Sequence, residues 1–123
     1  MARIWSEEEK LARWLDVELA ALDGWAAIGV VPAEAAVEIR ARAVPPTPQR
    51  VAEIEERTQH DVAAFVDAVG EQLGPIGRWF HYGLTSSDVL DTATALQVRE
   101  AGVLLLEGID RCIEAVVRRA EEH

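Results

Sequence analysis

Residues 87–121 read SDVLDTATALQVREAGVLLLEGIDRCIEAVVRRAE, and their apolar side chains recur every three or four positions. This period places them on one broad face of a single long helix. The face comprises Leu90, Ala93, Thr94, Gln97, Ala101, Leu104, Leu105, Cys112, Ile113 and Val116. A helix of about 35 residues requires packing partners along its whole length, and the preceding residues offer few. The pattern therefore predicts either a truncated helix bundle or an obligate oligomer.

The residues before this stretch also predict helices. Ser6 and Glu9 have the S-x-x-E spacing of a capping box, and Pro32 suits the first turn of a following helix. The prolines within 44–48 form a stiff connector, and Gly74 ends the next helix. No stretch alternates with the period of two that marks a strand. We expect an all-α protein with helices near 6–28, 33–43, 48–73 and 87–121.

Composition excludes several classes of function. Twelve basic against 22 acidic residues give a net charge of −10, which argues against binding nucleic acids or anionic membranes. No apolar run reaches the ~18 residues that a membrane span needs, and the start lacks the apolar core of a signal peptide. Cys112 is the only cysteine, and the three histidines are too scattered to form a zinc site. We therefore expect a cytoplasmic protein without metal or cofactor.

Glu18 lies in the middle of the apolar stripe of the first helix. One interpretation is a structural carboxylate that pairs with an arginine or reaches water at a helix crossing. The other is a buried acid that orients a second group. Buried charges are usually paired for reasons of stability, which favours the first interpretation.

The first polar segment that could carry chemistry is Thr58–Val62. On a continuous helix, His60 would lie almost opposite the apolar face of residues 51–69. Gln59 and Asp61 flank it. The segment is either an exposed polar face or a polar row presented to a ligand. In the second case Asp61 or a neighbour would fix the tautomer of the histidine.

The second polar segment is His81–Asp88, which places three hydroxyl groups at the start of the last helix. The first N–H groups of a helix have no intrahelical partners and carry partial positive charge, so they attract carboxylate or phosphate. Gly83 allows the loop backbone to approach a ligand closely. Capping by Thr or Ser explains one hydroxyl well and three poorly.

Both segments resemble adenylosuccinate lyase. The matching strings are TQHDVAAF at 58–65 and WFHYGLTSSDVLDTA at 79–93, and shorter matches extend the resemblance over essentially the whole chain. The second string is also similar to carboxymuconate cycloisomerases, whereas the segment at His60 favours the lyase. The resemblance implies an all-helical homotetramer. Residues 1–84 would then form the N-terminal helical domain, and 85–123 the first helix of the central bundle.

The resemblance also implies a reaction and a set of contacts. The family releases fumarate by β-elimination from adenylosuccinate, giving AMP, and from the succinyl-carboxamide ribotide of purine synthesis. The substrate-binding residues it implies are Gln59, His60, Asp61, Thr85, Ser86 and His81. The histidine general acid and the serine-bearing loop that supplies the base lie beyond residue 123, so we expect no catalytic residue here and no turnover by the chain alone.

Two alternatives remain at this point. The chain could come from another lyase or cycloisomerase of the same superfamily. It could instead be a stand-alone acidic helical interaction module, in which case both polar segments would be surface features only.

Overall fold

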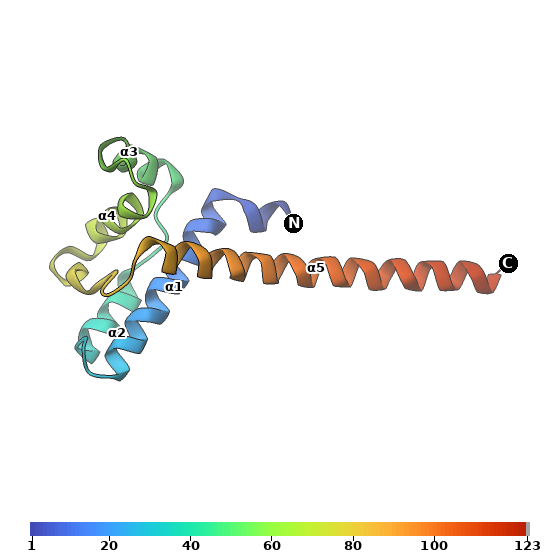
Figure 1. Cartoon of the computed structure of the whole chain (residues 1–123), viewed down its shortest axis with the longest axis horizontal. Helices are drawn as coiled ribbons and strands as arrows, with labels where there is room; N and C mark the ends of the chain where they lie inside the picture. The colour runs from blue at the N-terminus through green and yellow to red at the C-terminus, as the bar shows by residue number, and fades with distance from the viewer. Residues whose placement is uncertain (123) are drawn as a thin grey trace.

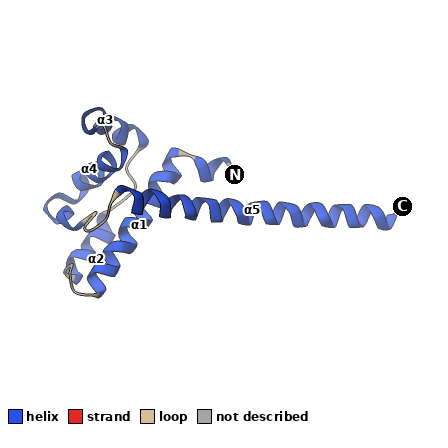
Figure 2. Cartoon of the chain, in the orientation of Figure 1, coloured by secondary structure: helices blue, strands red, loops and turns tan. Residues whose placement is uncertain are grey.

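The computed structural model describes residues 1–122, and these residues form helices and no strands (Figure 2). The prediction of an all-α protein is confirmed. The elements are η1 (Ala2–Trp5), α1 (Glu7–Ala27), α2 (Ala33–Arg42), α3 (Pro48–Thr58), α4 (Asp61–Leu73), η2 (Gly74–Trp79) and α5 (Ser86–Glu122), where η marks a 3-10 helix. The first four α-helices gather at one end of α5, which projects far beyond them (Figure 1). His123, the last residue of the expected bundle helix, lies outside the described residues.

The prediction of one helix over 48–73 is wrong, because the chain turns sharply between α3 and α4. Gln59 adopts the left-handed conformation with φ of 51° and ends α3, where its backbone N–H donates to Glu55 O at 2.8 Å. His60 is extended and caps α4, since its Nδ1 accepts the backbone N–H of Ala63 at 3.3 Å. The two helices then pack against each other. His60 therefore lies at a turn rather than on the face of a helix.

Aromatic side chains hold α1, α4 and the segment after η2 together. Trp14 meets Phe65 edge-on with ring centroids 5.4 Å apart, and the centroid of Phe80 lies 6.1 Å from that of Phe65. All three side chains are buried. Burying large apolar side chains is the main favourable term in folding, so this cluster fixes where the chain enters α5.

The first half of α5 packs on α1 and η1. Val89 and Ala93 are fully buried, and the buried Gln97 donates from Nε2 to Ile4 O at 2.6 Å. Arg3 donates to Glu100 at 2.5 Å on the same side. Up to Ala101 the helix is thus part of the compact end of the molecule.

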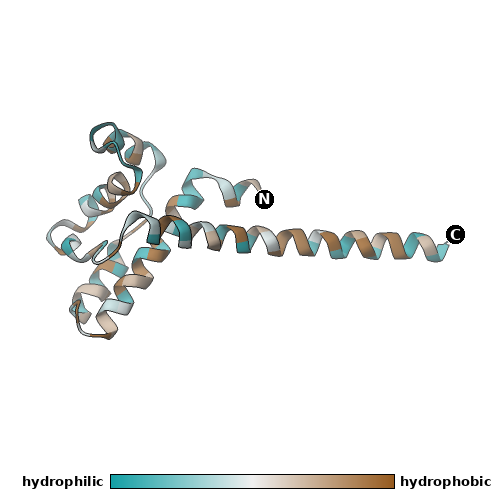
Figure 3. Ribbon diagram, viewed as in Figure 1, coloured by the Kyte–Doolittle hydropathy of each residue, from teal (hydrophilic) through white to brown (hydrophobic). Residues whose placement is uncertain are grey.

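The second half of α5 leaves apolar side chains exposed within the described residues, and Figure 3 shows the hydrophobic bands along it. The large ones beyond Ala101 are Val103, Leu104, Leu105, Leu106, Ile109, Ile113, Val116 and Val117. Between residues 1 and 122, no helix combines the length and apolar character needed to cross a membrane.

Candidate functional site at the start of α5

The two polar segments singled out in the sequence meet in the structure. His60 Nε2 lies 3.1 Å from Ser86 Oγ, although the residues are 26 positions apart. Because His60 Nδ1 accepts the N–H of Ala63, the proton of the neutral ring belongs on Nε2 and is donated to Ser86 Oγ. The hydroxyl proton of Ser86 then stays free to be donated to another group.

The start of α5 keeps two more hydroxyls available. Asp88 Oδ2 accepts the backbone N–H of Thr85 at 2.9 Å, and the N–H of Asp88 donates to Thr85 O at 3.1 Å. Within residues 1–122, no hydrogen bond uses the hydroxyl of Thr85 or Ser87. A carboxylate therefore makes the side-chain cap, and the hydroxyls are not consumed by capping. The helix start presents free hydroxyls beside free N–H groups, an arrangement that binds anions.

Gln59 and Asp61, the other two candidate residues of the first segment, form hydrogen bonds with nearby backbone groups. Gln59 Nε2 donates to Glu56 O at 2.9 Å and so covers the carbonyl end of α3. Asp61 Oδ1 accepts the N–H of Val62 at 2.7 Å and lies 3.5 Å from His60 Nδ1. Since Nδ1 already accepts from Ala63, the backbone of α4 rather than Asp61 sets the tautomer of the neutral His60 ring. Of the three, His60 alone reaches the start of α5 by a hydrogen bond.

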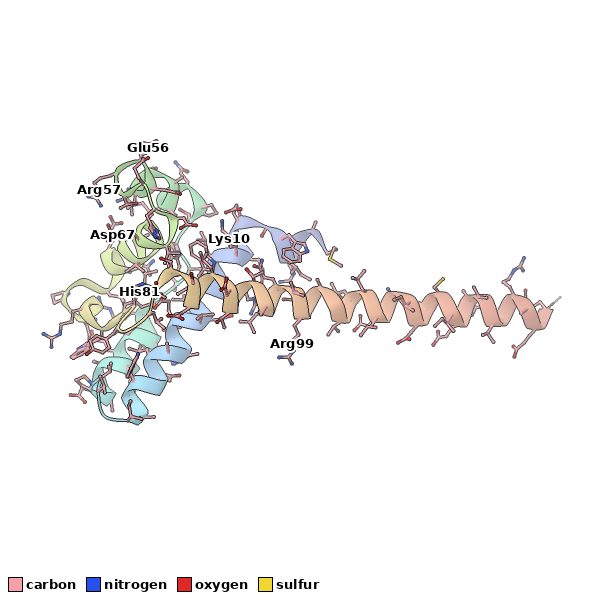
Figure 4. All side chains as sticks on the ribbon, viewed as in Figure 1. Lys10, Glu56, Arg57, Asp67, His81 and Arg99 are labelled. Carbon is pink, nitrogen blue, oxygen red and sulfur yellow. The ribbon has the colours of Figure 1, made fainter. Side chains whose placement is uncertain are left out.

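His81 lies in the loop that leads into α5, where Figure 4 labels it, and its partner is Glu18 of α1. His81 Nδ1 is 2.6 Å from Glu18 Oε1, and the side chain of Glu18 is 0% exposed. Burial raises the pKa of the Glu18 carboxyl, and the hydrogen bond from His81 offsets only part of that rise. The expected arginine partner is wrong, because the partner is a histidine. If Glu18 is instead a buried acid that orients another group, the imidazole of His81 is the candidate for that group.

The loop around His81 is pinned against α1. Gly83 has a φ of 72°, and a Cβ atom at this position would lie 2.8 Å from Cζ2 of Trp25. Tyr82 packs edge-on against the same Trp25 with ring centroids 5.8 Å apart. The loop therefore needs glycine both for its backbone conformation and for the space it leaves to the indole.

Backbone strain coincides with the two polar segments. In residues 1–122, the non-glycine residues with positive φ are Gln59 and His81, at 51° and 60°. Such conformations cost of order 1–3 kcal/mol each and persist only when surrounding contacts hold them. One strained residue stands beside His60, and the other bonds to Glu18. The described residues hold no cluster of His, Cys, Asp or Glu suited to a metal ion.

Sequence comparisons relate the chain to one group of enzymes. It is 47% identical to the adenylosuccinate lyase of Synechocystis sp. and 42% identical to that of Bacillus subtilis. Each match covers the whole of this chain and 28% of the relative. It is also 47% identical to the enzyme of Thermotoga maritima over 109 residues, or 89% of the chain and 25% of the relative. The chain thus spans about 28% of the length of the curated relatives it matches. No family model matches it.

Solved structures share the fold. A fumarate lyase from Mesorhizobium sp. BNC1 superposes with a TM-score of 0.81 and 28% identity, over 89% of this chain and 26% of that one. A β-carboxy-cis,cis-muconate cycloisomerase from Acinetobacter calcoaceticus shares the fold with a TM-score of 0.76 at 24% identity, over 92% of this chain and 28% of that one. The resemblance to the N-terminal portion of adenylosuccinate lyases is confirmed.

The pinned loop generates a prediction about stability. Gly83→Ala should destabilise the chain by about 2–4 kcal/mol, because it adds a left-handed alanine and a methyl group that overlaps Trp25. Gly102→Ala is the matched control, since its Cβ meets nothing within 4 Å and it lies inside α5. That change should stabilise by up to about 1 kcal/mol. Urea unfolding measures both, and equal stability of the two variants would contradict the pinned loop.

Proposed function

We propose that this chain, which corresponds to the N-terminal portion of the adenylosuccinate lyases, supplies part of the substrate-binding site of such an enzyme. The full-length enzyme would be a carbon–nitrogen lyase of purine nucleotide synthesis in the cytoplasm. It would release fumarate from adenylosuccinate, leaving AMP, and from the succinyl-carboxamide ribotide. The observation that carries the proposal is the hydrogen bond between His60 and Ser86, because it joins the two segments that resemble the family. Whole-chain identity to relatives of that name supports it.

The start of α5 would bind a carboxylate of the succinyl group. In the elimination, a base removes a proton from the carbon next to that carboxylate, the C–N bond breaks, and an acid protonates the departing nitrogen. Negative charge builds on the carboxylate as the proton leaves. Donors already aimed at it, such as the hydroxyls of Thr85 and Ser86 and the free N–H groups of the helix, lower the barrier. The acid and the base would come from other parts of the enzyme.

His60 would act by orienting Ser86. Its Nε2–H occupies a lone pair of Ser86 Oγ, so the serine hydroxyl is left to donate outward. The N-cap bond from Ala63 holds the ring in place. A fixed donor costs no reorganisation at the moment of reaction, which is why such positioning raises the rate.

Self-association would cover the exposed face of α5. The large apolar residues from Val103 to Val117 are at least 40% exposed in the described chain, and a contiguous apolar patch of this kind usually marks an interface. We propose that the full-length enzyme is a homotetramer, in which residues 1–84 form the first helical domain and 85–123 the first helix of the central bundle. Residues exposed here would then line a site assembled from several subunits.

The carboxylate site predicts a separation of activity from stability in the full-length enzyme. Ser86→Ala removes a donor to the developing charge, so turnover should fall by roughly 10²–10³-fold with near-normal melting. His60→Gln should also reduce turnover strongly, because it removes the group that orients Ser86. Fumarate release and thermal unfolding are measured on the same preparations.

Thr92→Ala serves as the control, because this hydroxyl lies further along α5, is exposed and makes no hydrogen bond within residues 1–122. It should keep near-normal turnover. A Ser86→Ala enzyme that loses about 1 kcal/mol of stability and keeps its turnover would identify Ser86 as a helix cap only.

A second prediction concerns the isolated 123-residue chain. It should release no fumarate above background, since the proposed acid and base lie outside it. Mixing or fusing it with the remaining domains should restore turnover. Fumarate is followed by its ultraviolet absorbance, and turnover by the rigorously purified chain alone would show that the division of catalytic groups is wrong.

A third prediction concerns assembly. The isolated chain should self-associate at high micromolar concentration through α5, because water contact with the apolar face is unfavourable. The double variant Leu105→Lys with Ile109→Lys should shift it toward monomer, since both side chains are more than half exposed. Val37→Lys, a change at a still more exposed position on α2, should leave association unchanged. Light scattering that finds a strict monomer in the unmodified chain would contradict the prediction.

A further inference from the structure

The carboxylate of Glu18 is a buried polar group whose hydrogen bonds the described chain satisfies only in part. Its side chain is fully buried, its Oε1 bonds to His81, and its Oε2 has no hydrogen-bond partner. An unpaired buried oxygen of this kind costs stability rather than adding it. Among residues 1–122, the ionisable group within ion-pair distance of Glu18 is His81. An apolar residue would pack better at this position, so the presence of a carboxylate here needs a reason other than packing.

The geometry at His81 supplies that reason. When the carboxylate of Glu18 is ionised it only accepts hydrogen bonds, so the short contact of 2.6 Å then places a proton on His81 Nδ1. The opposite ring nitrogen, Nε2, has no hydrogen-bond partner in the described chain and is not among its buried unpaired atoms. With the side chain 24% exposed, the ring therefore shows Nε2 to solvent while Nδ1 is held inside.

The backbone of His81 agrees with this arrangement. Its φ of 60° is a conformation that non-glycine residues adopt only when other contacts hold them. The bond to Glu18 and the packing of the adjacent Tyr82 on Trp25 are such contacts. The same loop continues within five residues to Thr85 and Ser86. A shift of His81 would therefore disturb the start of α5.

We propose that Glu18 is a positioning residue, which keeps the proton of His81 on Nδ1 and presents Nε2 of the ring to the substrate. The inference rests on the proposed function for its effect on turnover, whereas the position of the proton belongs to this chain alone. The orienting carboxylate of a catalytic triad acts on its histidine through the same kind of bond. Glu18 itself touches no substrate.

The proton position is tested by nitrogen NMR on the 123-residue chain. In the unmodified chain the ¹⁵N shifts of His81 should show the proton on Nδ1, both in the neutral ring and in the cation. In Glu18→Gln, the amide can accept or donate, so the neutral ring should become a mixture of tautomers. A neutral His81 protonated on Nε2 in the unmodified chain would overturn the proposal. This measurement uses the unmodified chain, so it does not depend on whether the variant folds.

The stability of Glu18→Gln provides a readout that a purely structural ion pair would not give. The pKa of Glu18 is raised by burial, so the folded state binds more protons than the unfolded state and loses stability as pH rises through that raised pKa. The glutamine variant lacks this loss. It should be at least as stable as the unmodified chain at neutral pH, and its advantage should shrink in acid. A variant that is strongly destabilised at neutral pH would identify Glu18 as a structural pair member instead.

Turnover completes the test in the full-length enzyme. Glu18→Gln should lower kcat/KM by roughly 10–100-fold and shift its pH profile, as expected for a group that orients another. Glu38→Gln, an exposed carboxylate of α2 that pairs with Arg42, is the matched control and should change nothing. An unmodified enzyme that releases no fumarate would refute the proposed function, and the NMR result would still decide the role of Glu18. An active enzyme with normal kcat/KM and pH profile in Glu18→Gln would refute the positioning role.

Discussion

A hydrogen bond between Glu18 and His81 ties the middle of α1 to the loop from which α5 begins. The loop is held a second time where Gly83 lies against the indole of Trp25. These contacts fix the first turn of α5, and with it the position of Ser86, which His60 then reaches from the turn between α3 and α4. A buried charge and a strained backbone both oppose folding, so the apolar core around Phe65 must offset them. The features that cost stability therefore lie next to the proposed site.

Most of the helices could be predicted from the sequence, because their signals are local. The capping box at Ser6, the proline connector and the apolar period of α5 each act within a few residues, and α1, α3 and α5 begin within a residue of where these signals place them. The turn at Gln59 could not be predicted in this way. Glycine or asparagine usually marks a left-handed residue, and here a glutamine adopts it. The apolar side chains of α3 and α4 also stay in phase across the turn, so only the packing of one helix on the other reveals it.

The same distinction between local signals and long-range contacts applies to the candidate site. Its residues could be chosen from sequence, because hydroxyls at a helix start and a resemblance to a known family both act through short strings. Their contacts could not be predicted, because the hydrogen bond between His60 and Ser86 depends on the turn between α3 and α4, which the sequence pattern does not indicate. Glu18 stood out as a charge in an apolar stripe, but its partner lies 63 positions away. The expected arginine is not the residue that reaches Glu18, because only the fold brings the loop of His81 to α1.

A crystal structure of the proposed full-length enzyme with a succinyl substrate analogue that resists elimination tests the central claim most directly. The account predicts a carboxylate of the succinyl group within about 2.7–3.2 Å of Ser86 Oγ, with Thr85 and the first N–H groups of α5 around the same carboxylate. His60 should keep its bond to Ser86 in that complex. An analogue whose carboxylates bind elsewhere, with the start of α5 open to water, would contradict it.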